Sequence, residues 1–311
     1  MHEDIKNLKI LVTGGTGYIG SELVTKLISI GCEVSIIKRS TSHLKRLDHI
    51  LDQLSVYECN ESTQSVLNIL GDAKPDVVVH LASLFIAEHK SHDVEALIAS
   101  NLLFSSQIVE AMKVNNINFL VNTGTSWEHY NNSEYNPACL YAATKGAFES
   151  ILEYYIQTSE LNVVTLKLFD TYGPRDTRPK LIPLLQKLAL SGDSLPMSKG
   201  EQLIDLVYID DVIEAFLIAI NRLRLFEVRG GESYAVSSLN PITLQDLVYK
   251  YQMVTGMKIN IGWGLREYRA REIMIPWNMG CNIPGWTPKV DLLDGLSRLA
   301  SVKEQTKFFK A

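Results

Sequence analysis

The sequence has few cysteines and no long apolar run. Its four cysteines are far apart and show no metal-ligand spacing: Cys32, Cys59, Cys139 and Cys281. We therefore expect reduced thiols, as in a cytoplasmic protein. No apolar run approaches the roughly 20 residues that a membrane-spanning helix needs. The first residues, MHEDIKNLK, have no apolar stretch and no small-residue cleavage site, so we expect neither a secretory signal nor a membrane partner.

The sequence also lacks an excess of positive charge and a metal-binding pattern of histidines. The net charge of −5 is spread through the chain, whereas a nucleic-acid-binding protein would show a basic stripe. The seven histidines form no HExxH or similar pair, so we expect no metal. The apolar and charged fractions are those of an ordinary globular protein, so they favour neither disorder nor a fibrous architecture.

The first half of the chain alternates short β-branched runs with helical patterns, which predicts a parallel sheet covered by helices. The expected strands are residues 9–12, 33–37, 76–80, 118–122 and 163–168, and the expected helices are 21–30, about 93–114 and about 140–159. From about residue 175, prolines and glycines become more frequent and apolar segments shorter. We expect a first domain at 1–174, to which 205–228 returns, and a smaller lobe at 175–204 and 229–311.

A glycine-rich turn follows the first expected strand, in the segment LKILVTGGTGYIG at residues 8–20. Glycines in this spacing let the backbone turn tightly, approach a pyrophosphate and pack the next helix against the sheet. The phosphates would lie at the N-terminus of that helix, where free N–H groups favour an anion. We predict an α/β fold, a Rossmann-type doubly wound parallel sheet with a smaller C-terminal α/β substrate lobe. Its dinucleotide would contact Gly14, Thr16, Gly17, Tyr18, Ile19 and Gly20.

The end of the second expected strand indicates which dinucleotide is preferred. Proteins that bind NAD place an acidic residue there to bind the ribose 2′-hydroxyl. This chain has Lys38, Arg39 and Ser40 instead. Two cations and a hydroxyl suit a 2′-phosphate, which an arginine can bind with paired charged hydrogen bonds. We predict NADP(H), although the two cations could instead be ordinary solvated surface charges.

Tyr141 and Lys145 stand four residues apart in an expected helix, so their side chains share one face. A free tyrosine has a pKa of about 10, and a nearby ammonium lowers it by stabilising the phenolate. Such a tyrosine can serve as an acid or a base. This spacing also occurs by chance in surface pairs.

Residues 122–126 follow an expected buried strand, at the edge where open α/β sheets bind ligands. Thr125 is therefore a candidate to hydrogen-bond the reacting oxygen of a substrate. Thr123 and Ser126 could instead cap the local backbone.

The motifs together resemble the extended short-chain dehydrogenase/reductase family in order and spacing, over almost the whole chain. They are TGGTGYIG, HLAS at 80–83, Asn101, the Thr125 turn, YAATK at 141–145, TYGP, YIDDV at 208–212 and PGWTPKVDLLDGL at 284–296. The resemblance implies that Thr125, Tyr141 and Lys145 are catalytic and that the C-terminal lobe holds a nucleotide-sugar. It implies a homodimer, in which helices starting near Asp93 and Leu140 pack against the partner. It further implies a cofactor lined by Leu81, Ala82, Ser83, Asn101 and Thr123.

Departures from the family pattern indicate the reaction. Sugar 4,6-dehydratases carry Asp-Glu after the catalytic threonine, where this chain has Ser126 and Trp127. Epimerases commonly retain NAD, which fits Arg39 poorly. The segment 125–145 resembles bacterial O-antigen 4-ketoreductases such as CDP-abequose and CDP-paratose synthases. The resemblance implies NADPH-dependent reduction of the 4-keto group of a CDP- or dTDP-linked 4-keto-6-deoxy or 3,6-dideoxy hexose, for lipopolysaccharide. The alternatives are a nucleotide-sugar 4-epimerase that recycles NAD(P) and a non-catalytic NADP-sensing protein.

Two departures concern the substrate side. Asp170 stands where the family often has Asn, and Ile204 stands where it often has Arg. Diphosphate binding would then fall to Arg269 or Arg271, which could also be plain surface arginines. Trp127 could line a sugar pocket or pack in the core. The expected substrate residues are Ser126, Trp127, Asp170, Ile182, Arg269 and Arg271.

Overall fold

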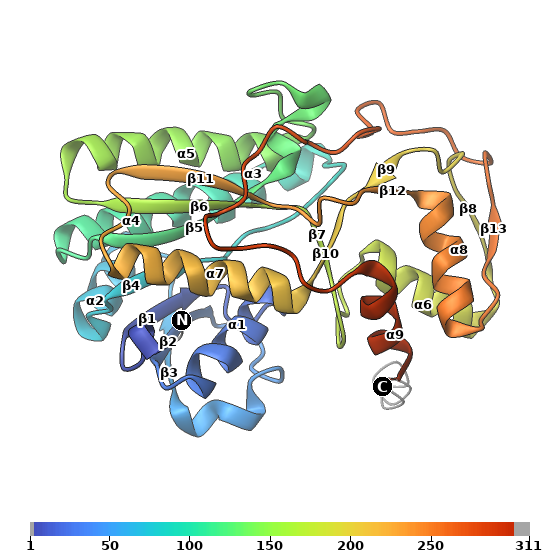
Figure 1. Ribbon diagram of the computed structural model, residues 1–311. Coiled ribbons are helices and arrows are strands. Elements are labelled where there is room, and N and C mark those ends of the chain that lie inside the picture. The colour runs from blue at the N-terminus through green and yellow to red at the C-terminus, as the bar shows by residue number, and fades with distance from the viewer. Residues whose placement is uncertain (1–2, 302–311) are drawn as a thin grey trace.

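A computed structural model describes residues 3–301 of the chain (Figure 1). A seven-stranded parallel sheet occupies its first part, in the spatial order β11-β6-β5-β4-β1-β2-β3. The strands are β1 (Lys9–Thr13), β2 (Glu33–Arg39), β3 (Leu54–Cys59), β4 (Val77–His80), β5 (Phe119–Thr125), β6 (Asn162–Leu168) and β11 (Gly231–Val236). The strand order changes direction between β1 and β4, which is where such sheets bind ligands. The predicted doubly wound fold is confirmed.

Helices cover both faces of this sheet and give it two apolar cores (Figure 1). One face packs against α1 (Tyr18–Ser29) and α7 (Ile209–Arg224), and the other against α2 (Thr63–Ala73), α4 (Phe104–Val114) and α5 (Leu140–Thr158). Strands in the middle of the sheet are apolar on both sides for this reason, and every residue of β4 is buried. No helix in the described part of the chain is long and apolar enough to cross a membrane.

The expected helix at about 93–114 is interrupted. Residues Val94–Ile98 form α3, and a π-helical turn at Ala99–Leu103 joins it to α4. A π-helical turn shifts the side chains that follow it around the helix axis and is frequent at functional sites. Here the turn contains Asn101, which is buried.

A smaller lobe follows the sheet and lies at its carboxyl edge (Figure 1). It contains the helices α6 (Leu181–Ser191), α8 (Leu244–Thr255) and α9 (Leu292–Ser301). Short strand pairs connect it: β7 (Asp170–Tyr172) with β10 (Leu206–Tyr208), β9 (Leu203–Ile204) with β12 (Ile242–Thr243), and β8 (Ser194–Pro196) with β13 (Asn260–Gly262). The strand β11 belongs to the segment 229–311 that we expect in the lobe, yet it pairs with β6 in the main sheet. Its sequence, GESYAV, is too short and mixed to be recognised as a strand.

Candidate active site

The glycine-rich turn between β1 and α1 packs directly against the segment after β4. Gly14 has a φ of 70°, and a Cβ there would lie 2.7 Å from the Ala82 nitrogen. A Cβ on Gly20 would lie 2.1 Å from the Gly14 carbonyl oxygen, so only glycine lets α1 begin this close to the turn. Within the described residues no side chain caps the first turn of α1, at Tyr18 and Ile19, which leaves N–H groups for an anion.

A polar group on β5 faces the same edge of the sheet. The Thr123 hydroxyl is buried and has no hydrogen-bond partner among the described residues. A buried polar group without a partner costs free energy unless a ligand supplies one. The glycine turn and this hydroxyl therefore fit a bound dinucleotide.

The segment 81–84 after β4 is held in place by Asn101. The Asn101 side-chain amide donates to the Leu84 carbonyl oxygen (2.9 Å) and to the Thr144 hydroxyl on α5 (3.0 Å). Its oxygen accepts from the Leu84 N–H (2.7 Å) and the Ser83 hydroxyl (3.1 Å). The amide is thus fully used within the protein, and Asn101 positions Ser83 between the glycine turn and α5.

A cavity of about 700 Å³ lies beside the end of β2, where we predict the 2′-phosphate. Arg39 lines this cavity, and within the described residues its guanidinium has no side-chain partner. Basic side chains of the following loop line it too, which the sequence analysis overlooked although the segment RSTSHLKR carries them. They are His43, Lys45 and Arg46.

Lys38 does not join Arg39 in this cavity. Its ammonium lies 2.6 Å from the Glu58 carboxylate on the neighbouring strand β3. Adjacent residues of a strand point to opposite faces of the sheet, so Lys38 and Arg39 diverge. Ser40 is exposed and does not line the cavity either. Of the three residues predicted for the phosphate, Arg39 is the one that the structure places there.

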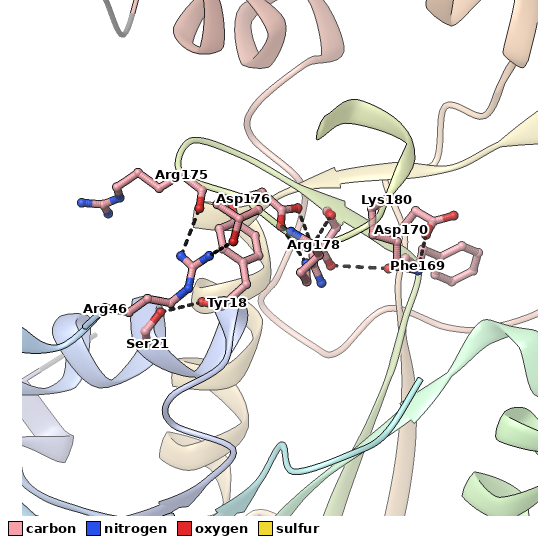
Figure 2. Close-up of polar contacts among 11 residues, drawn as sticks. Tyr18, Ser21, Arg46, Phe169, Asp170, Arg175, Asp176, Arg178 and Lys180 are labelled. Carbon is pink, nitrogen blue, oxygen red and sulfur yellow. Dashed lines mark hydrogen bonds and ion pairs between the residues drawn. The ribbon is translucent and has the colours of Figure 1, made fainter. Parts of the chain in front are cut away.

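Arg46 connects the cofactor side to the loop that leads into the lobe, as Figure 2 shows. Its guanidinium donates to the Arg175 carbonyl oxygen (3.0 Å) and to the Thr177 hydroxyl (2.7 Å). Further along the loop, the Arg178 guanidinium lies 4.6 Å from the centre of the Tyr18 ring on α1 and pairs with Asp176. The loop therefore rests on the first turn of α1.

The predicted catalytic residues come together at the carboxyl end of β5. Thr125 is the last residue of β5, and Tyr141 and Lys145 lie in the first two turns of α5. Burial raises the pKa of the Tyr141 phenol, an effect that the nearby hydroxyls of Ser83 and Thr125 offset only in part, and the Phe85 ring packs edge-on against it at 5.0 Å. This geometry is consistent with the prediction that Thr125, Tyr141 and Lys145 lie together. The sequence did not indicate that Ser83 also lies beside the Tyr141 phenol.

The environment of Tyr141 differs from the one we expect from the spacing with Lys145. Burial raises the pKa of Tyr141 above its ordinary value, and the negative charge of Glu128 raises it further. Lys145 is buried, which lowers the pKa of its ammonium to about 8. In the unliganded protein Tyr141 is therefore a neutral phenol at neutral pH, and Lys145 is largely charged.

A second cavity, of about 430 Å³, lies between the turn after β5 and the lobe; Thr125, Tyr141 and Lys145 do not line it, but Phe85, which packs against Tyr141, does. Its walls are rich in aromatic side chains, and His129 stacks on Trp277 with ring centres 3.9 Å apart. A cleft that combines aromatic walls with charged groups is typical of a small-molecule site. The aromatic and predicted residues that line it include Phe85, Ser126, Trp127, His129, Phe169, Asp170, Ile204, Arg269 and Trp277.

The cleft contains a cation that the sequence analysis did not consider, Lys180. Its ammonium lies 3.2 Å from the Asp170 carboxylate (Figure 2). It also lies 3.8 Å from the centre of the Phe85 ring. Arg269 also lines the cleft, over the Trp127 ring, but its guanidinium is held by two hydrogen bonds to Glu272 (2.7 and 2.9 Å). Lys180 is thus less tightly bound by a carboxylate than Arg269. Arg266 lines the cleft too, and its guanidinium lies 3.7 Å from the Glu88 carboxylate.

Two predicted substrate residues lie outside the cleft. The Arg271 guanidinium lies over the Tyr130 ring at 4.2 Å and bonds the Asn136 side chain, and Arg271 does not line the cavity. Ile182 is buried in the core as part of α6. The sequence places each in the right segment, but neighbouring residues of a segment point in different directions, which spacing alone does not reveal.

Comparisons with known proteins agree with this geometry. The sequence model of the NAD dependent epimerase/dehydratase family matches residues 10–236. The CDP-abequose synthase of Yersinia pseudotuberculosis is 29% identical over 275 residues, which cover 86% of this chain and 92% of that protein.

Two solved structures share the fold. The UDP-glucose 4-epimerase of Thermotoga maritima, solved with UDP-glucose, has a TM-score of 0.83 at 23% identity, over 96% of this chain and 99% of that one. The UDP-N-acetylglucosamine 4-epimerase of Methanobrevibacter ruminantium M1, solved with UDP-N-acetylmuramic acid, has a TM-score of 0.84 at 22% identity, over 98% and 100%.

We predict that Asn101→Ala lowers the free energy of unfolding by about 3 kcal/mol, because each buried group left unsatisfied costs about 1–3 kcal/mol. It should also weaken dinucleotide binding, since segment 81–84 loses its anchor. Chemical denaturation and a fluorescence titration measure the two effects. The matched control is Asn115→Ala, which removes two amide hydrogen bonds to backbone carbonyls at the far end of α4. Equal effects of both variants on dinucleotide affinity would contradict the anchoring role.

Proposed function

The chain belongs to the NAD dependent epimerase/dehydratase family, and on that premise we propose that it reduces the 4-keto group of a nucleotide-linked deoxy-hexose with NADPH. Its family uses nicotinamide cofactors and modifies nucleotide-sugars. The observation that carries the proposal is the position of the Tyr141 phenol, which lies beside the hydroxyls of Ser83 and Thr125 and packs against Phe85, a residue that lines the aromatic cleft. A neutral phenol is suited to donate a proton to a ketone oxygen as it becomes an alkoxide.

In this mechanism the chain supplies the proton and stabilises the charge. NADPH, when bound, supplies the hydride that the keto carbon receives. Tyr141 donates its proton to the forming alkoxide, and the Thr125 hydroxyl donates a hydrogen bond to the same oxygen. The Lys145 ammonium stabilises the phenolate that remains. Hydrogen-bond donors aimed at an oxygen that gains charge are a large source of rate in such sites.

The preference for NADPH rests on the charges around the larger cavity. Arg39, His43, Lys45 and Arg46 line it, and no acidic residue ends β2. The two carboxylates that line the cavity are engaged elsewhere, because Glu22 pairs with Arg175 and Asp176 pairs with Arg178. A 2′-phosphate would therefore meet cations.

For the substrate, we propose that Lys180 binds the diphosphate and that Phe85 and Trp127 contact the sugar. The ammonium lies at the mouth of the aromatic part of the cleft, and its partner Asp170 is about a third exposed. A diphosphate would compete with that carboxylate for the ammonium. We favour a CDP-sugar because the most similar curated relatives include CDP-abequose synthases.

We further propose that the protein works in the cytoplasm as a homodimer that supplies a deoxy-sugar for a surface polysaccharide. The helices α4 and α5 and the turn before them carry large exposed apolar side chains suited to an interface with a second copy. They are Leu103, Val114 and Tyr154.

The direct test of the reaction follows NADPH absorbance with a panel of CDP-, dTDP-, UDP- and GDP-linked 4-keto-deoxy sugars. Stoichiometric loss of NADPH with one nucleotide series supports the reductase. A sugar whose configuration changes without net NADPH loss would instead indicate a 4-epimerase, for which the same trio would serve. NADPH binding without any change in the sugars would favour a non-catalytic NADP-sensing protein.

We predict that Tyr141→Phe lowers kcat by about 10²–10⁴-fold, the usual contribution of a positioned acid. The affinity for NADPH should stay the same, because the phenol does not bind the cofactor phosphates. Stopped-flow turnover and equilibrium titration measure the two quantities. Turnover equal to that of the unmodified protein would overturn the assignment of Tyr141.

We predict that Arg39→Ala raises the Kd for NADPH by about 10- to 100-fold, since hydrogen bonds to a charged group contribute about 1.5–3 kcal/mol. The Kd for NADH should change little, because NADH lacks the 2′-phosphate. Lys38→Ala is the matched comparison, since its ammonium is paired with Glu58 outside the cavity. An equal loss of affinity for NADPH and NADH would refute the role of Arg39.

We predict that Lys180→Met raises KM for the nucleotide-sugar about 10-fold or more and changes kcat less, because the diphosphate is bound equally before and during hydride transfer. Lys187→Met on the exposed side of the same helix is the control. Initial-rate kinetics with both variants test this, and an unchanged KM for Lys180→Met would exclude the ammonium from the diphosphate site.

A further inference from the structure

A cluster of three charged side chains lies directly beneath the end of β5. The Lys167 ammonium on β6 is 2.9 Å from the Glu128 carboxylate and 3.2 Å from the Glu149 carboxylate on α5. Glu128 and Lys167 are buried, and Glu149 is about three-quarters covered. Burying charges is costly, and the cluster has a single ammonium for two carboxylates. We call Glu128, Lys167 and Glu149 the carboxylate cluster.

Glu128 joins this cluster to the catalytic threonine. One of its carboxylate oxygens accepts a hydrogen bond from the Thr125 N–H (2.9 Å), and the other accepts from Lys167 (2.9 Å). In return, the Thr125 hydroxyl oxygen accepts from the Trp127 N–H (3.3 Å). The two bonds form a reciprocal cap on the short helical turn Ser126–Glu128, which fixes Thr125 from both sides.

The cluster presses against β5 at a glycine. Gly124 lies opposite Lys167 in the strand register, and a Cβ on Gly124 would lie 2.9 Å from a Glu149 oxygen and 3.2 Å from a Glu128 oxygen. Any side chain at this position would push the carboxylates away from Thr125. Because residue 124 has no side chain, the two carboxylates can lie beside Gly124, one residue before Thr125.

We propose that Glu128 is a positioning residue for the reduction: it fixes Thr125 through the backbone and places a buried negative charge behind Tyr141, while Lys167 holds its carboxylate in place. The inference rests on the proposed function, in which Thr125 and Tyr141 act on a ketone oxygen. It adds a residue that touches neither the substrate nor the cofactor.

The electrostatics of the neighbouring groups support this role. After burial, the charge of Glu128 is the largest factor that raises the pKa of Tyr141, and it partly offsets the lowering of the Lys145 pKa by burial. Both effects favour protonated forms, which are the forms that proton donation requires. The other titratable groups that face the cluster are His129, whose pKa is lowered by burial and Lys167, and Tyr135, whose pKa is raised by burial and the two carboxylates.

Glu149 differs from Glu128 in its link to the site. Burial, and then the charge of Glu128, raise its pKa to about 7, and one of its oxygens has no hydrogen-bond partner among the described residues. It makes no bond to Thr125, so it shares the chemistry of Glu128 but not its position. This makes Glu149 a comparison within the same cluster.

The test uses Glu128→Gln and Glu128→Ala in the full-length protein, with kcat/KM measured across pH. Glutamine keeps the acceptor for the Thr125 N–H and removes the charge, and Lys167 remains paired with Glu149. Activity in the reductive direction falls as pH rises through the pKa of Lys145, about 8, and then through the higher pKa of Tyr141, and the charge of Glu128 raises both. We expect Glu128→Gln to move this fall to lower pH. We expect Glu128→Ala, which also removes the acceptor, to lower kcat/KM about 10²-fold, as for a misplaced catalytic group.

The controls separate the possible failures. Glu232→Gln removes a carboxylate that accepts from Arg222 and the Tyr234 hydroxyl on the edge strand β11, and it should not move the pH profile. Glu149→Gln should move it less than Glu128→Gln. A profile of Glu128→Gln that superimposes on the unmodified protein, with Tyr141→Phe inactive, would overturn this inference alone. A fully active Tyr141→Phe would overturn the proposed function itself.

A purely structural role of Glu128 predicts another pattern. Both Glu128 variants would then unfold at lower denaturant concentration, while the pH profile of the folded fraction would stay in place, and this would also overturn the inference. If Glu128→Ala does not fold, the pH profile of Glu128→Gln alone tests the inference. If neither folds, Gly124→Ala provides the same readout, because its Cβ displaces both carboxylates and should move the profile in the same direction.

Discussion

The ion pair between Lys167 and Glu128 is the interaction on which the reactive edge of the sheet depends. It joins β6 to the turn after β5. Both side chains are buried, and the Lys167 ammonium lies 2.9 Å from the Glu128 carboxylate. Removing Lys167 would leave the buried Glu128 carboxylate uncompensated, whereas removing Glu128 leaves Lys167 paired with Glu149. Because the second oxygen of Glu128 holds the Thr125 N–H, the same pair fixes the residue that would meet the substrate oxygen. Burial and the charge of Glu128 both raise the pKa of Tyr141 above that of an ordinary tyrosine, which is itself neutral at neutral pH.

Two other sets of hydrogen bonds, made by Asn101 and Arg46, fix the segments around the site. Asn101 uses its whole amide to hold segment 81–84 against Thr144, and a π-helical turn brings that amide to the site. Arg46 ties the loop beside the larger cavity to the loop that supplies Lys180. The side of the molecule that fits a dinucleotide is therefore mechanically joined to the aromatic cleft, although the two cavities share no lining residue.

Local sequence was sufficient to predict the features that depend on neighbours in the chain. The glycine turn, the first strand and helix, and the four-residue spacing of Tyr141 and Lys145 belong to this group, and so does the fold class. Features that depend on the alignment of neighbouring strands could not be predicted from local sequence. Lys167 faces Gly124 only because β5 and β6 are aligned there, and no spacing along the chain indicates that a lysine 39 positions after Glu128 binds it. Lys38 and Arg39 look alike in the sequence, yet the pleat of β2 sends Lys38 to Glu58.

The central claim is that burial and the charge of Glu128 keep Tyr141 protonated, so that it acts as an acid toward a ketone. Its most direct test is a pH titration of tyrosine labelled with ¹³C at Cζ, followed by NMR in the NADPH-bound protein, with Tyr141→Phe to assign the signal. The account predicts that Tyr141 gives the signal of a neutral phenol through neutral pH and titrates no lower than an ordinary tyrosine, at about 10. A phenolate signal for Tyr141 already at neutral pH would contradict it.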